Sequence, residues 1–505
     1  DGDLQEGMSS EASSLAGTQA LGNLKVIYDD NRISIEGDTN LAFTEDVSAR
    51  YRAYGWHVIE VPTTLDGNVD LEKFNLAANE ALNEKNRPTL IRVKTVIAWP
   101  APNAKNTSES HGSALGSEEV AATKEVLGLD PKVDFYISEE IFCHTRKAKV
   151  WGQELEDEWN EELKNWRSSN PDKSQLLDRL VNKELPRDWE SALPVFESGK
   201  DISTRVASGK VISAIANLLP EFWGGSADLG GSNMTSISNG GSFLPKSSGV
   251  EGSNPYGRVI HFGIREHAMA SIMNGMALYG FTRPFGATFL IFSDYQKPAI
   301  RLASLMQLPV IYVWTHDSIG LGEDGPTHQP VEQLWSLRAI PGFSVVRPCD
   351  ANEVRETYLR IIKDQLPAGI VLTRQNIVTL DRNIYASAKN ATKGAYILSE
   401  AKDKNPKSIL ISTGSEVHLA LEAQKILESE NISTRVVSMP CLEWFKKESL
   451  EYRESVIPSN IDVKIAVEAG ATFGWYQIGG KKGSGIGGEH EGASGKPEVL
   501  EKEDG

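Results

Sequence analysis

Ionisable side chains interrupt an otherwise apolar stretch at residues 261–275, HFGIREHAMASIMNG. The β-branched run before the interruption predicts a buried strand, and the methionines and isoleucine after it recur at the spacing of one helix face. Glu266 therefore falls in the first turn of the helix, where the helix dipole stabilises a carboxylate by about 0.3–1 kcal/mol. An unpaired carboxylate in the interior costs several kcal/mol. A buried Glu266 therefore requires a partner.

The stretch THDSIGLGEDGPTHQP, residues 315–330, is a loop that follows a β-branched and aromatic strand. It holds two histidines, two aspartates, one glutamate and three glycines. Glycine lets a backbone approach a ligand closely, and the His and Asp side chains offer donors and acceptors to a polyhydroxylated substrate. We interpret the stretch as a binding loop; a surface loop with satisfied side chains is the alternative.

Oxygen-bearing side chains occur at two predicted strand ends near the start of the chain. Asp1 opens an acidic turn, DGDLQEG, and Asn31 follows the strand that ends in YDDNRISI. If the two strands are parallel with a helix between them, both residues lie at neighbouring carboxyl-end loops, where open α/β sheets bind ligands. With the Ile33 carbonyl they form an oxygen-only set suited to Mg²⁺ or Ca²⁺. Asp and Asn also form turns at such ends without any metal.

Two arginines and a serine, Arg205, Arg374 and Ser232, each lie beside a predicted helix or strand boundary. The planar guanidinium can bind phosphate through two parallel hydrogen bonds, which lysine cannot. These residues are candidates for a phosphate site. A surface ion pair would explain either arginine taken alone.

The segment ATFLIFSDY carries three aromatic residues three positions apart, Phe289, Phe292 and Tyr295. At this spacing they could form one aromatic wall on a helical turn. Core packing explains the same pattern equally well.

Short apolar strand patterns alternate with amphipathic helix patterns along almost all of the 505 residues, which predicts an α/β protein with mostly parallel, doubly wound sheets. The stretch after Lys147 is highly charged, with three tryptophans, Trp151, Trp159 and Trp166, on one helical face. We interpret it as a connector whose tryptophans anchor against a domain. The predicted divisions are residues 1–146, a linker at 147–200, 201–385 and 386–505.

Composition excludes several classes of protein. A net charge of −17 and a pI near 5.2 argue against wholesale binding to nucleic acid, which needs dense Lys and Arg. Three widely spaced cysteines suggest neither a disulfide framework nor a zinc site. No apolar run reaches the ~18 residues of a membrane span, and the first residues do not resemble a signal peptide.

Seven motifs in order, DG…YDDN, SHGSALG, GGSADL, GIREHAM, TFLIFSDY, THDSIGLGEDGPTHQPVEQ and TRQN, closely resemble transketolase, especially plant and algal forms. The resemblance spans nearly the whole chain. It implies three doubly wound α/β domains: a diphosphate-binding domain that is incomplete at 1–146, a pyrimidine-binding domain at 201–385 and a C-terminal domain at 386–505. It also implies a homodimer with thiamine diphosphate bound between the subunits.

The resemblance also implies roles for the residues that contact the cofactor. Glu266 matches the glutamate that hydrogen-bonds a pyrimidine nitrogen and favours the imino tautomer of that ring. The aromatic cradle of that ring is matched by Phe289, Phe292 and Tyr295, and a neighbour of the thiazolium by Asp228. The contacts of the diphosphate and its metal ion are matched by Asp1, Gly2, Asn31 and Ile33. The ion would be Mg²⁺ or Ca²⁺.

On the substrate side, four residues match phosphate-binding positions: Arg205, Ser232, His316 and Arg374. Three more match groups that contact sugar hydroxyls or move protons: His111, Asp324 and His328. Glu6 and Glu11 resemble carboxylates that join Glu266 in a hydrogen-bonded chain between the two active sites. The implied reaction moves a two-carbon ketol unit from a ketose phosphate to an aldose phosphate, in the pentose phosphate pathway or the Calvin cycle.

Two departures from the family pattern stand out. The chain begins inside the metal motif, so we expect a segment of the family's first domain to precede Asp1. In the tail, Glu491, Glu501 and Asp504 stand where relatives carry apolar or aromatic residues. Burying these charges unpaired would be costly, so we expect the tail to be exposed and loose, or its sequence to be unrepresentative of the molecule.

Two alternative functions stay open at this point. One is a related thiamine-diphosphate synthase of the dihydroxyacetone synthase or deoxyxylulose-phosphate synthase type. The other is a catalytically silent fragment or binding subunit. The plant-like motifs point to the chloroplast stroma as the location, with the cytoplasm as the alternative.

Overall fold

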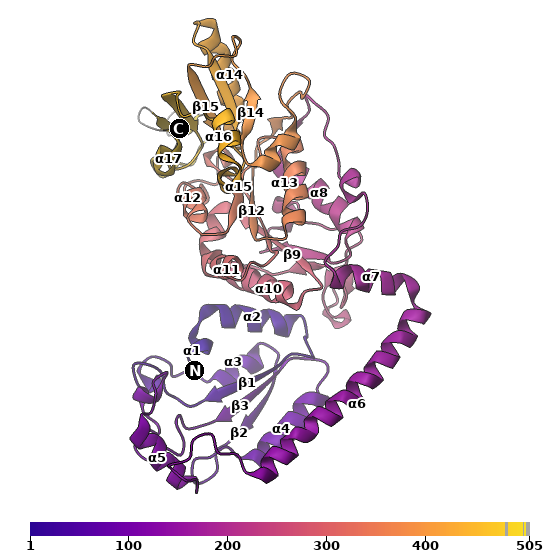
Figure 1. Cartoon of the computed structure of the whole chain (residues 1–505), viewed down its shortest axis with the longest axis vertical. Helices are drawn as coiled ribbons and strands as arrows, with labels where there is room; N and C mark the ends of the chain where they lie inside the picture. The colour runs from indigo at the N-terminus through magenta and orange to yellow at the C-terminus, as the bar shows by residue number, and fades with distance from the viewer. Residues whose placement is uncertain (480–482, 498, 501–505) are drawn as a thin grey trace. The chain divides into compact units, whose positions relative to one another are not determined.

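The computed structural model describes residues 1–479, 483–497 and 499–500. It consists of two compact units, Asp1–Glu184 and Leu185–Gly505, whose helices and strands are labelled in Figure 1. Short 3-10 helices occur in both units: η1 (Thr39–Leu41), η2 (Ser108–Ser110), η3 (Trp189–Ala192), η4 (Lys246–Ser248), η5 (Leu290–Phe292), η6 (Ile319–Leu321), η7 (Ala388–Lys393) and η8 (Phe473–Trp475).

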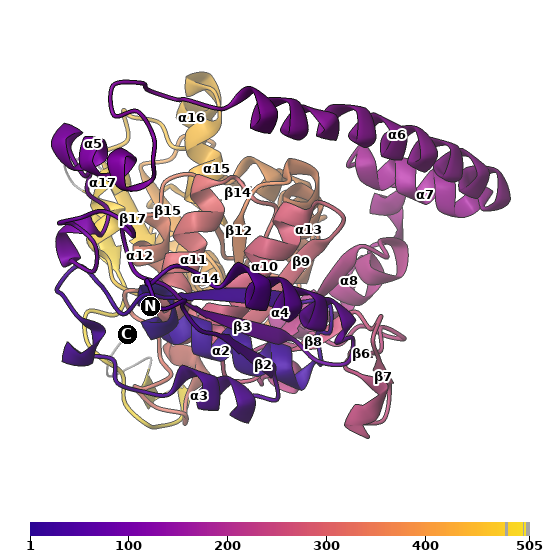
Figure 2. The same cartoon turned by 90° about the horizontal axis from the view of Figure 1, so that it is seen from below.

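The first unit is built on a three-stranded parallel sheet in the order β1-β3-β2 (Figure 1). Figure 2 shows β2 and β3 from another side, together with helices of this unit. The strands are β1 (Lys25–Asp30), β2 (His57–Val61) and β3 (Thr89–Lys94). The helices are α1 (Gly2–Gln5), α2 (Gly7–Thr18), α3 (Val47–Ala53), α4 (Leu71–Asn83), α5 (Ser117–Val126), α6 (Glu139–Ser169) and α7 (Pro171–Val181). All three strands were expected from their β-branched runs.

Helix α6 contains no proline and a single glycine, Gly152, and it has a cap at its start, which favours a long helix. The Ser138 hydroxyl accepts from the backbone N–H of Ile141 at 3.3 Å, and Pro171 begins the next helix. The predicted boundary after residue 146 falls inside this helix. Its three tryptophans are 61%, 57% and 38% exposed, so the expected anchoring of Trp151, Trp159 and Trp166 is not observed in the described chain.

The second unit contains an eight-stranded parallel sheet in the order β11-β12-β10-β9-β5-β8-β6-β7. Its strands are β5 (Phe222–Ser226), β6 (Ser242–Phe243), β7 (Ser253–Asn254), β8 (Val259–His261), β9 (Arg283–Phe289), β10 (Ile311–Thr315), β11 (Ser344–Val346) and β12 (Ala368–Leu372). The associated helices are α8 (Thr204–Leu218), α9 (Gly230–Asn233), α10 (Glu266–Tyr279), α11 (Ser293–Leu305), α12 (Gln333–Arg338) and α13 (Ala351–Asp364). A small antiparallel pair, β4 (Asp201–Ile202) with β13 (Ile377–Val378), brings together the start and the end of the stretch that contains these strands and helices.

A five-stranded sheet follows in the same unit, in the order β14-β16-β15-β17-β18. Its strands are β14 (Tyr396–Ser399), β15 (Ser408–Ser412), β16 (Thr434–Ser438), β17 (Val463–Val467) and β18 (Ser484–Ile486), and only the β14–β16 pair is antiparallel. The helices are α14 (Glu416–Ser429), α15 (Leu442–Lys447), α16 (Leu450–Val456) and α17 (Tyr476–Gly479). The expected α/β class with three mostly parallel sheets is confirmed.

Polar residues gather where several strands of both large sheets end. His316 and Asp317 follow β10, Arg347 follows β11, and Thr373 follows β12. In the five-stranded sheet, Thr413 follows β15 and Glu468 follows β17 in the same way. These carboxyl ends are where parallel α/β sheets present their functional side chains.

In the portion of the chain that the structure describes, no helix combines the length and the apolar character needed to cross a membrane.

Candidate active site

The four residues expected to bind phosphate come together in the second unit. The Arg205 Nη1 group donates to the Ser232 backbone carbonyl at 2.9 Å. Burial, and then the positive charge of Arg374, lower the pKa of the Arg205 guanidinium. The Arg205 Nε atom is buried and has no hydrogen-bond partner. Two neighbouring cations and an unsatisfied donor form a site that an anion would complete.

Each of these side chains is delivered by a strand end or a helix start. Arg205 lies in the first turn of α8, and Ser232 lies in the short helix α9 after β5. His316 follows β10 with a backbone φ of 60°, and Arg374 follows β12 two residues past its last residue. A left-handed φ is unfavourable for a residue other than glycine, so surrounding contacts must hold His316 in place.

A buried hydrogen-bond chain sets the protonation of His316. The Thr315 hydroxyl lies 2.7 Å from Asn233 Oδ1, to which it donates, and 2.8 Å from His316 Nδ1. Because the hydroxyl proton goes to Asn233, the Thr315 oxygen accepts from an N–H at Nδ1. Burial, then Arg205, Arg374 and His328, lower the pKa of His316 to about 3. The imidazole is therefore neutral near pH 7, with its lone pair on Nε2.

The expected aromatic wall is present next to this histidine. The rings of Phe289 and Phe292 are stacked with centroids 6.1 Å apart, and Phe292 stacks on Tyr295 at 6.2 Å. The Phe289 ring centroid lies 3.7 Å from that of His316, and the His328 ring meets Phe292 edge-on at 5.5 Å. The structure thus joins the aromatic segment and both ends of the 315–330 loop into one surface.

Three other expected residues of the second unit occupy distinct surroundings. Glu266 is the first residue of α10 and is only 9% exposed, as expected for a carboxylate withdrawn from bulk solvent. Asp228 is exposed in the loop after β5, with a backbone φ of 65°. Asp324 is exposed in the 315–330 loop.

The expected metal ligands lie together in the first unit. Asp1 accepts through Oδ1 from the Tyr28 hydroxyl and through Oδ2 from the Arg32 backbone N–H at 2.9 Å. Asn31 Oδ1 accepts from the Ile33 N–H at 2.9 Å. The residues that follow β1 therefore lie against the Asp1 carboxylate, and the candidate ligand oxygens of Asp1 and Asn31 lie close to each other. Among the described residues no three His, Cys, Asp or Glu side chains cluster as a metal site, and the expected set contains only one carboxylate.

The remaining expected residues of the first unit are near the surface. Gly2 begins α1, and Glu6 is the exposed N-cap residue of α2, whereas Glu11 is half-buried within α2. His111 is exposed directly after η2. Their roles stay predictions.

The charged tail is partly described. Glu491 is exposed, in agreement with the expectation that a charge here avoids burial. Glu501 and Asp504 lie outside the described residues.

Sequence reasoning missed the residues that support the site. Asn233 and Thr315 are uncharged, and both are fully buried. Arg347 and Glu416 are buried ion partners far apart in the chain. Their position in the predicted elements was the available sequence signal: Thr315 ends a strand, Arg347 follows one and Glu416 begins a helix.

Three family models match consecutive parts of the chain. They are described as "Transketolase, thiamine diphosphate binding domain" at residues 1–186, "Transketolase, pyrimidine binding domain" at residues 200–379 and "Transketolase-like TK C-terminal domain" at residues 394–505. Together they cover nearly the whole chain.

Similar proteins carry the same name over their common length. A transketolase of Mycobacterium leprae is 48% identical over 100% of this chain and 72% of its own length. A transketolase of Bacillus subtilis is 45% identical over 99% of this chain and 74% of its own length. The solved structure of a Pichia stipitis transketolase in complex with sedoheptulose-7-phosphate has a TM-score of 0.92 and 40% identity, over 99% of this chain and 72% of that one.

These matches correct one expectation. The chloroplast location is wrong, because the Mycobacterium and Bacillus relatives are bacterial proteins and bacteria contain no chloroplasts. The Calvin-cycle setting loses its support with it. The chain spans 72–74% of the length of these relatives.

The alternative functions are not favoured by any of the matches, since both the relatives and the structural neighbours are transketolases. The first matched domain identifies the cofactor as thiamine diphosphate. Three matched domains, identities of 45–48% and a shared fold place this chain in the transketolase family of thiamine-diphosphate-dependent transferases.

Proposed function

We propose that the cluster of Arg205, Ser232, His316 and Arg374 is the phosphate subsite of this transferase, and that its substrates are phosphorylated ketoses and aldoses. The observation that carries the proposal is the pair of neighbouring guanidinium groups with an orphaned, buried Nε. Left without an anion, the two cations repel each other in a partly buried place. The Pichia stipitis relative is described with a seven-carbon ketose phosphate bound.

His316 adds a proton-linked step to phosphate binding. In the neutral Nδ1–H form its Nε2 atom can accept a hydrogen bond but cannot donate one to a phosphate oxygen. Arg205 and Arg374 help to depress its pKa, and an arriving dianion offsets those two charges. The pKa of His316 therefore rises on phosphate binding, and a proton held at Nε2 can then bridge the imidazole and the phosphate.

The residues around Glu266 fit the pyrimidine ring of thiamine diphosphate. A flat aromatic wall of Phe289, Phe292 and Tyr295 suits a heteroaromatic ring, and Tyr295 is 63% exposed and so accessible. The cofactor supplies the carbanion chemistry when it is bound. Glu266, withdrawn from solvent at the start of α10, would hold a proton on a ring nitrogen, and His328 beside Phe292 would donate or accept protons at the substrate hydroxyls.

In the first unit, Asp1, Asn31 and the Ile33 carbonyl would hold a divalent cation on the cofactor diphosphate. Carboxylate, amide and carbonyl oxygens are the ligands that Mg²⁺ and Ca²⁺ take. Asp1 and Asn31 are already linked through the Arg32 turn, so little reorganisation is needed to bring their oxygens to one ion.

The working assembly is a homodimer. Helices α10 and α11 expose several large apolar side chains, and these are Leu278, Tyr279, Leu302, Leu305 and Met306. An apolar surface of this kind on a soluble protein marks an interaction site. Pairing of two copies through it would place the Glu266 region at the subunit interface.

The experiment that tests the function offers the protein a ketose phosphate and an aldose phosphate with thiamine diphosphate and Mg²⁺. Transfer of a two-carbon unit without release of carbon dioxide supports the proposal. Consumption of pyruvate with release of carbon dioxide would contradict it. The phosphate subsite is tested separately by Arg374→Ala, which should raise KM for phosphorylated ketoses and leave KM for unphosphorylated ketoses nearly unchanged.

A further inference from the structure

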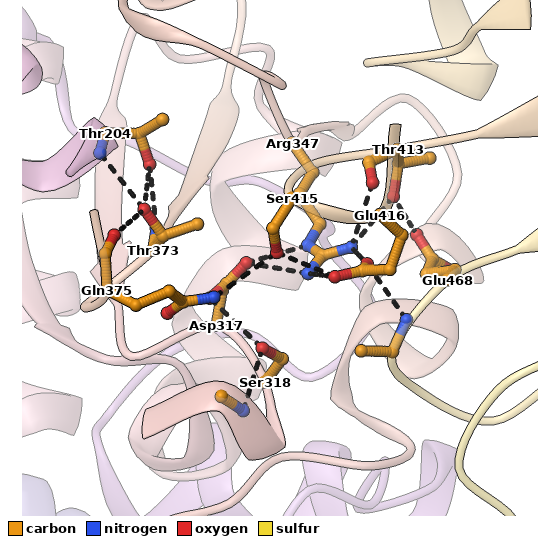
Figure 3. A network of polar contacts seen from close by, with 12 residues as sticks. Thr204, Asp317, Ser318, Arg347, Thr373, Gln375, Thr413, Ser415, Glu416 and Glu468 are labelled. Atoms are coloured by element: carbon orange, nitrogen blue, oxygen red, sulfur yellow. Dashed lines mark hydrogen bonds and ion pairs between the residues drawn. The ribbon is translucent and has the colours of Figure 1, made fainter. Parts of the chain in front are cut away.

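A largely buried ion cluster connects the eight-stranded sheet to the five-stranded sheet (Figure 3). Arg347, at the end of β11, has no exposed surface. Its Nε donates to Asp317 Oδ2 at 2.9 Å, and its Nη2 lies 2.8 Å from the same oxygen. On its other side Arg347 donates to both carboxylate oxygens of Glu416, the first residue of α14.

The cluster continues into the five-stranded sheet. Arg347 Nη1 donates to the Thr413 hydroxyl at 3.1 Å, and that hydroxyl donates to Glu468 at 2.6 Å. Glu468 is held in turn by a bidentate pair with Arg338, with both distances 2.7 Å. Burial acts to lower the pKa of the Arg347 guanidinium, but Glu416 and Asp317 outweigh it and raise that pKa. Arg347 is therefore a fixed positive charge.

Two members of the network lie one residue from a member of the phosphate subsite. Asp317 follows His316 directly in the chain, and Gln375 follows Arg374. The Ser415 hydroxyl links Gln375 to Glu416, since it donates to Glu416 at 2.7 Å and accepts from Gln375 Nε2 at 3.4 Å. Glu416 is connected to Asp317 through Arg347.

A third connection reaches Arg205. The Thr373 hydroxyl donates to the Gln375 carbonyl at 2.9 Å and accepts from the Thr204 backbone N–H at 3.1 Å. The Thr204 hydroxyl accepts in return from the Thr373 N–H at 2.7 Å. Figure 3 shows this chain of contacts running from Thr204 to Glu416 without interruption. Residues next to Arg205, His316 and Arg374 thus belong to one largely buried network.

We propose that Arg347, Ser415 and Glu416 are positioning residues for the phosphate subsite, so that the C-terminal domain sets the enzyme's affinity for phosphorylated sugars without touching them. The proposal rests on the phosphate subsite proposed above. The five-stranded sheet supplies none of the expected site residues, yet its Glu416 fixes the guanidinium that holds Asp317. Asp317 directly follows His316, whose backbone φ is 60°, so fixing the Asp317 side chain would restrain that strained backbone.

The alternative is that the cluster only joins two sheets. A buried ion pair is weak evidence for added stability, because desolvation offsets most of the attraction. The directional hydrogen bonds of the cluster are better suited to fixing positions, because a guanidinium bound to two carboxylates has one low-energy arrangement. A shift of the Arg347 guanidinium would therefore move His316 and Arg374 together. A joining role predicts a change of stability alone, whereas a positioning role predicts a change of phosphate affinity.

The test uses two substitutions in the full chain. Glu416→Gln keeps the shape of the side chain but removes its charge, and Ser415→Ala removes the hydroxyl that links Glu416 to Gln375. Each should raise KM for a ketose phosphate by about tenfold, in line with loss of one hydrogen bond to a charged group. The value of kcat and the KM of an unphosphorylated ketose should change less than about twofold. Ser415→Thr, which keeps the hydroxyl, should restore the KM.

Glu353→Gln is the matched control, because Glu353 is also a buried glutamate and also bridges the two sheets. It accepts from Tyr396 at 2.7 Å and from Ser438 at 2.8 Å, and none of these partners adjoins a phosphate-binding residue. This variant should leave the KM of the ketose phosphate unchanged. An equal rise in the control would overturn the proposal in favour of a joining role.

A second measurement separates this proposal from the proposed subsite. The dissociation constant of inorganic phosphate is measured for the same variants and for Arg374→Ala, without any need for turnover. Weaker binding in Arg374→Ala but not in Glu416→Gln or Ser415→Ala would reject the positioning role and keep the subsite. No change in Arg374→Ala would reject the subsite itself.

Discussion

Glu266 gives the sharpest test at the scale of single residues. Glu266→Gln should leave the fold nearly intact, because the amide has the same shape and fits the same place at the start of α10. It should slow exchange of the cofactor's C2 proton by about 100-fold or more, the usual contribution of a positioned acid or base. Proton exchange on the bound cofactor is followed by NMR after quenching in acid. Exchange at the wild-type rate would refute the assigned role.

His316 predicts a pH dependence of stability. Its pKa is about 3 in the folded protein and near 6.5 in the unfolded chain, because burial disfavours the imidazolium. Below pH 6.5 the unfolded chain binds a proton that the folded protein does not, so stability is lost as the pH falls towards 3. At pH 5 the loss is about 2 kcal/mol.

Urea unfolding at pH 7.5 and pH 5 measures this loss. In His316→Asn the difference in unfolding free energy between the two pH values should shrink by about 2 kcal/mol. Equal differences in the variant and the wild type would mean that the histidine is already protonated or solvated in the folded state.

At the scale of elements, the close approach of β5 and β8 leaves no room for a side chain at Gly225. These strands pair with Gly225 opposite Ile260, and β8 leads directly to the Glu266 turn. A Cβ on Gly225 would lie 1.9 Å from the Ile260 carbonyl oxygen, and neither backbone can move without breaking the sheet. Gly225→Ala should therefore lower the free energy of unfolding by about 3 kcal/mol or more.

The matched control for that substitution is Gly231→Ala in α9, where no atom lies within 4 Å of the added methyl group. Its unfolding midpoint in urea should stay within about 0.5 kcal/mol of the wild type. Comparable losses in both variants would show that the β5–β8 contact is not the cause.

The sequence could predict the elements that carry a strong local pattern. The runs of β10, β12 and β15 are β-branched and apolar, so both their type and their burial follow from the sequence. The two-residue strands β6 and β7 have no period to detect, and the antiparallel direction of β14 depends on its tertiary pairing. The aromatic wall was predictable because its members are close in the chain.

The buried network was not predictable, because its members are far apart in the chain. Asp317 and Arg347 come from two strand ends and Glu416 from the start of a helix, and each alone looks like an ordinary surface charge in the sequence. Only folding of the two sheets against each other within the second unit turns them into one cluster. The tautomer of His316 likewise depends on Asn233, which is remote in the chain.

At the scale of the whole molecule, the proposed homodimer predicts complementation between inactive variants. Asp1→Ala would disable the metal side of the site and Glu266→Gln the pyrimidine side. If each site combines the first domain of one subunit with the second domain of its partner, a mixed dimer contains one intact site and one doubly altered site. An equal mixture refolded or co-expressed should recover about a quarter of wild-type activity, since about half of the dimers are mixed.

The mixed sample is compared with each variant alone at the same total concentration. Sedimentation analysis confirms that dimers are present in all three samples. Recovery no greater than the sum of the two variants would mean that each site belongs to a single subunit.

The complete burial of Arg347 has a consequence for the influence of dissolved ions. Salt screens charges that face water, but it does not reach a guanidinium with no exposed surface. Raising the ionic strength should therefore weaken capture of a sugar phosphate at the exposed Arg374, while the ratio of affinities between wild type and Glu416→Gln stays constant. A ratio that drifts towards one with added potassium chloride would show that water enters the interior between the two sheets.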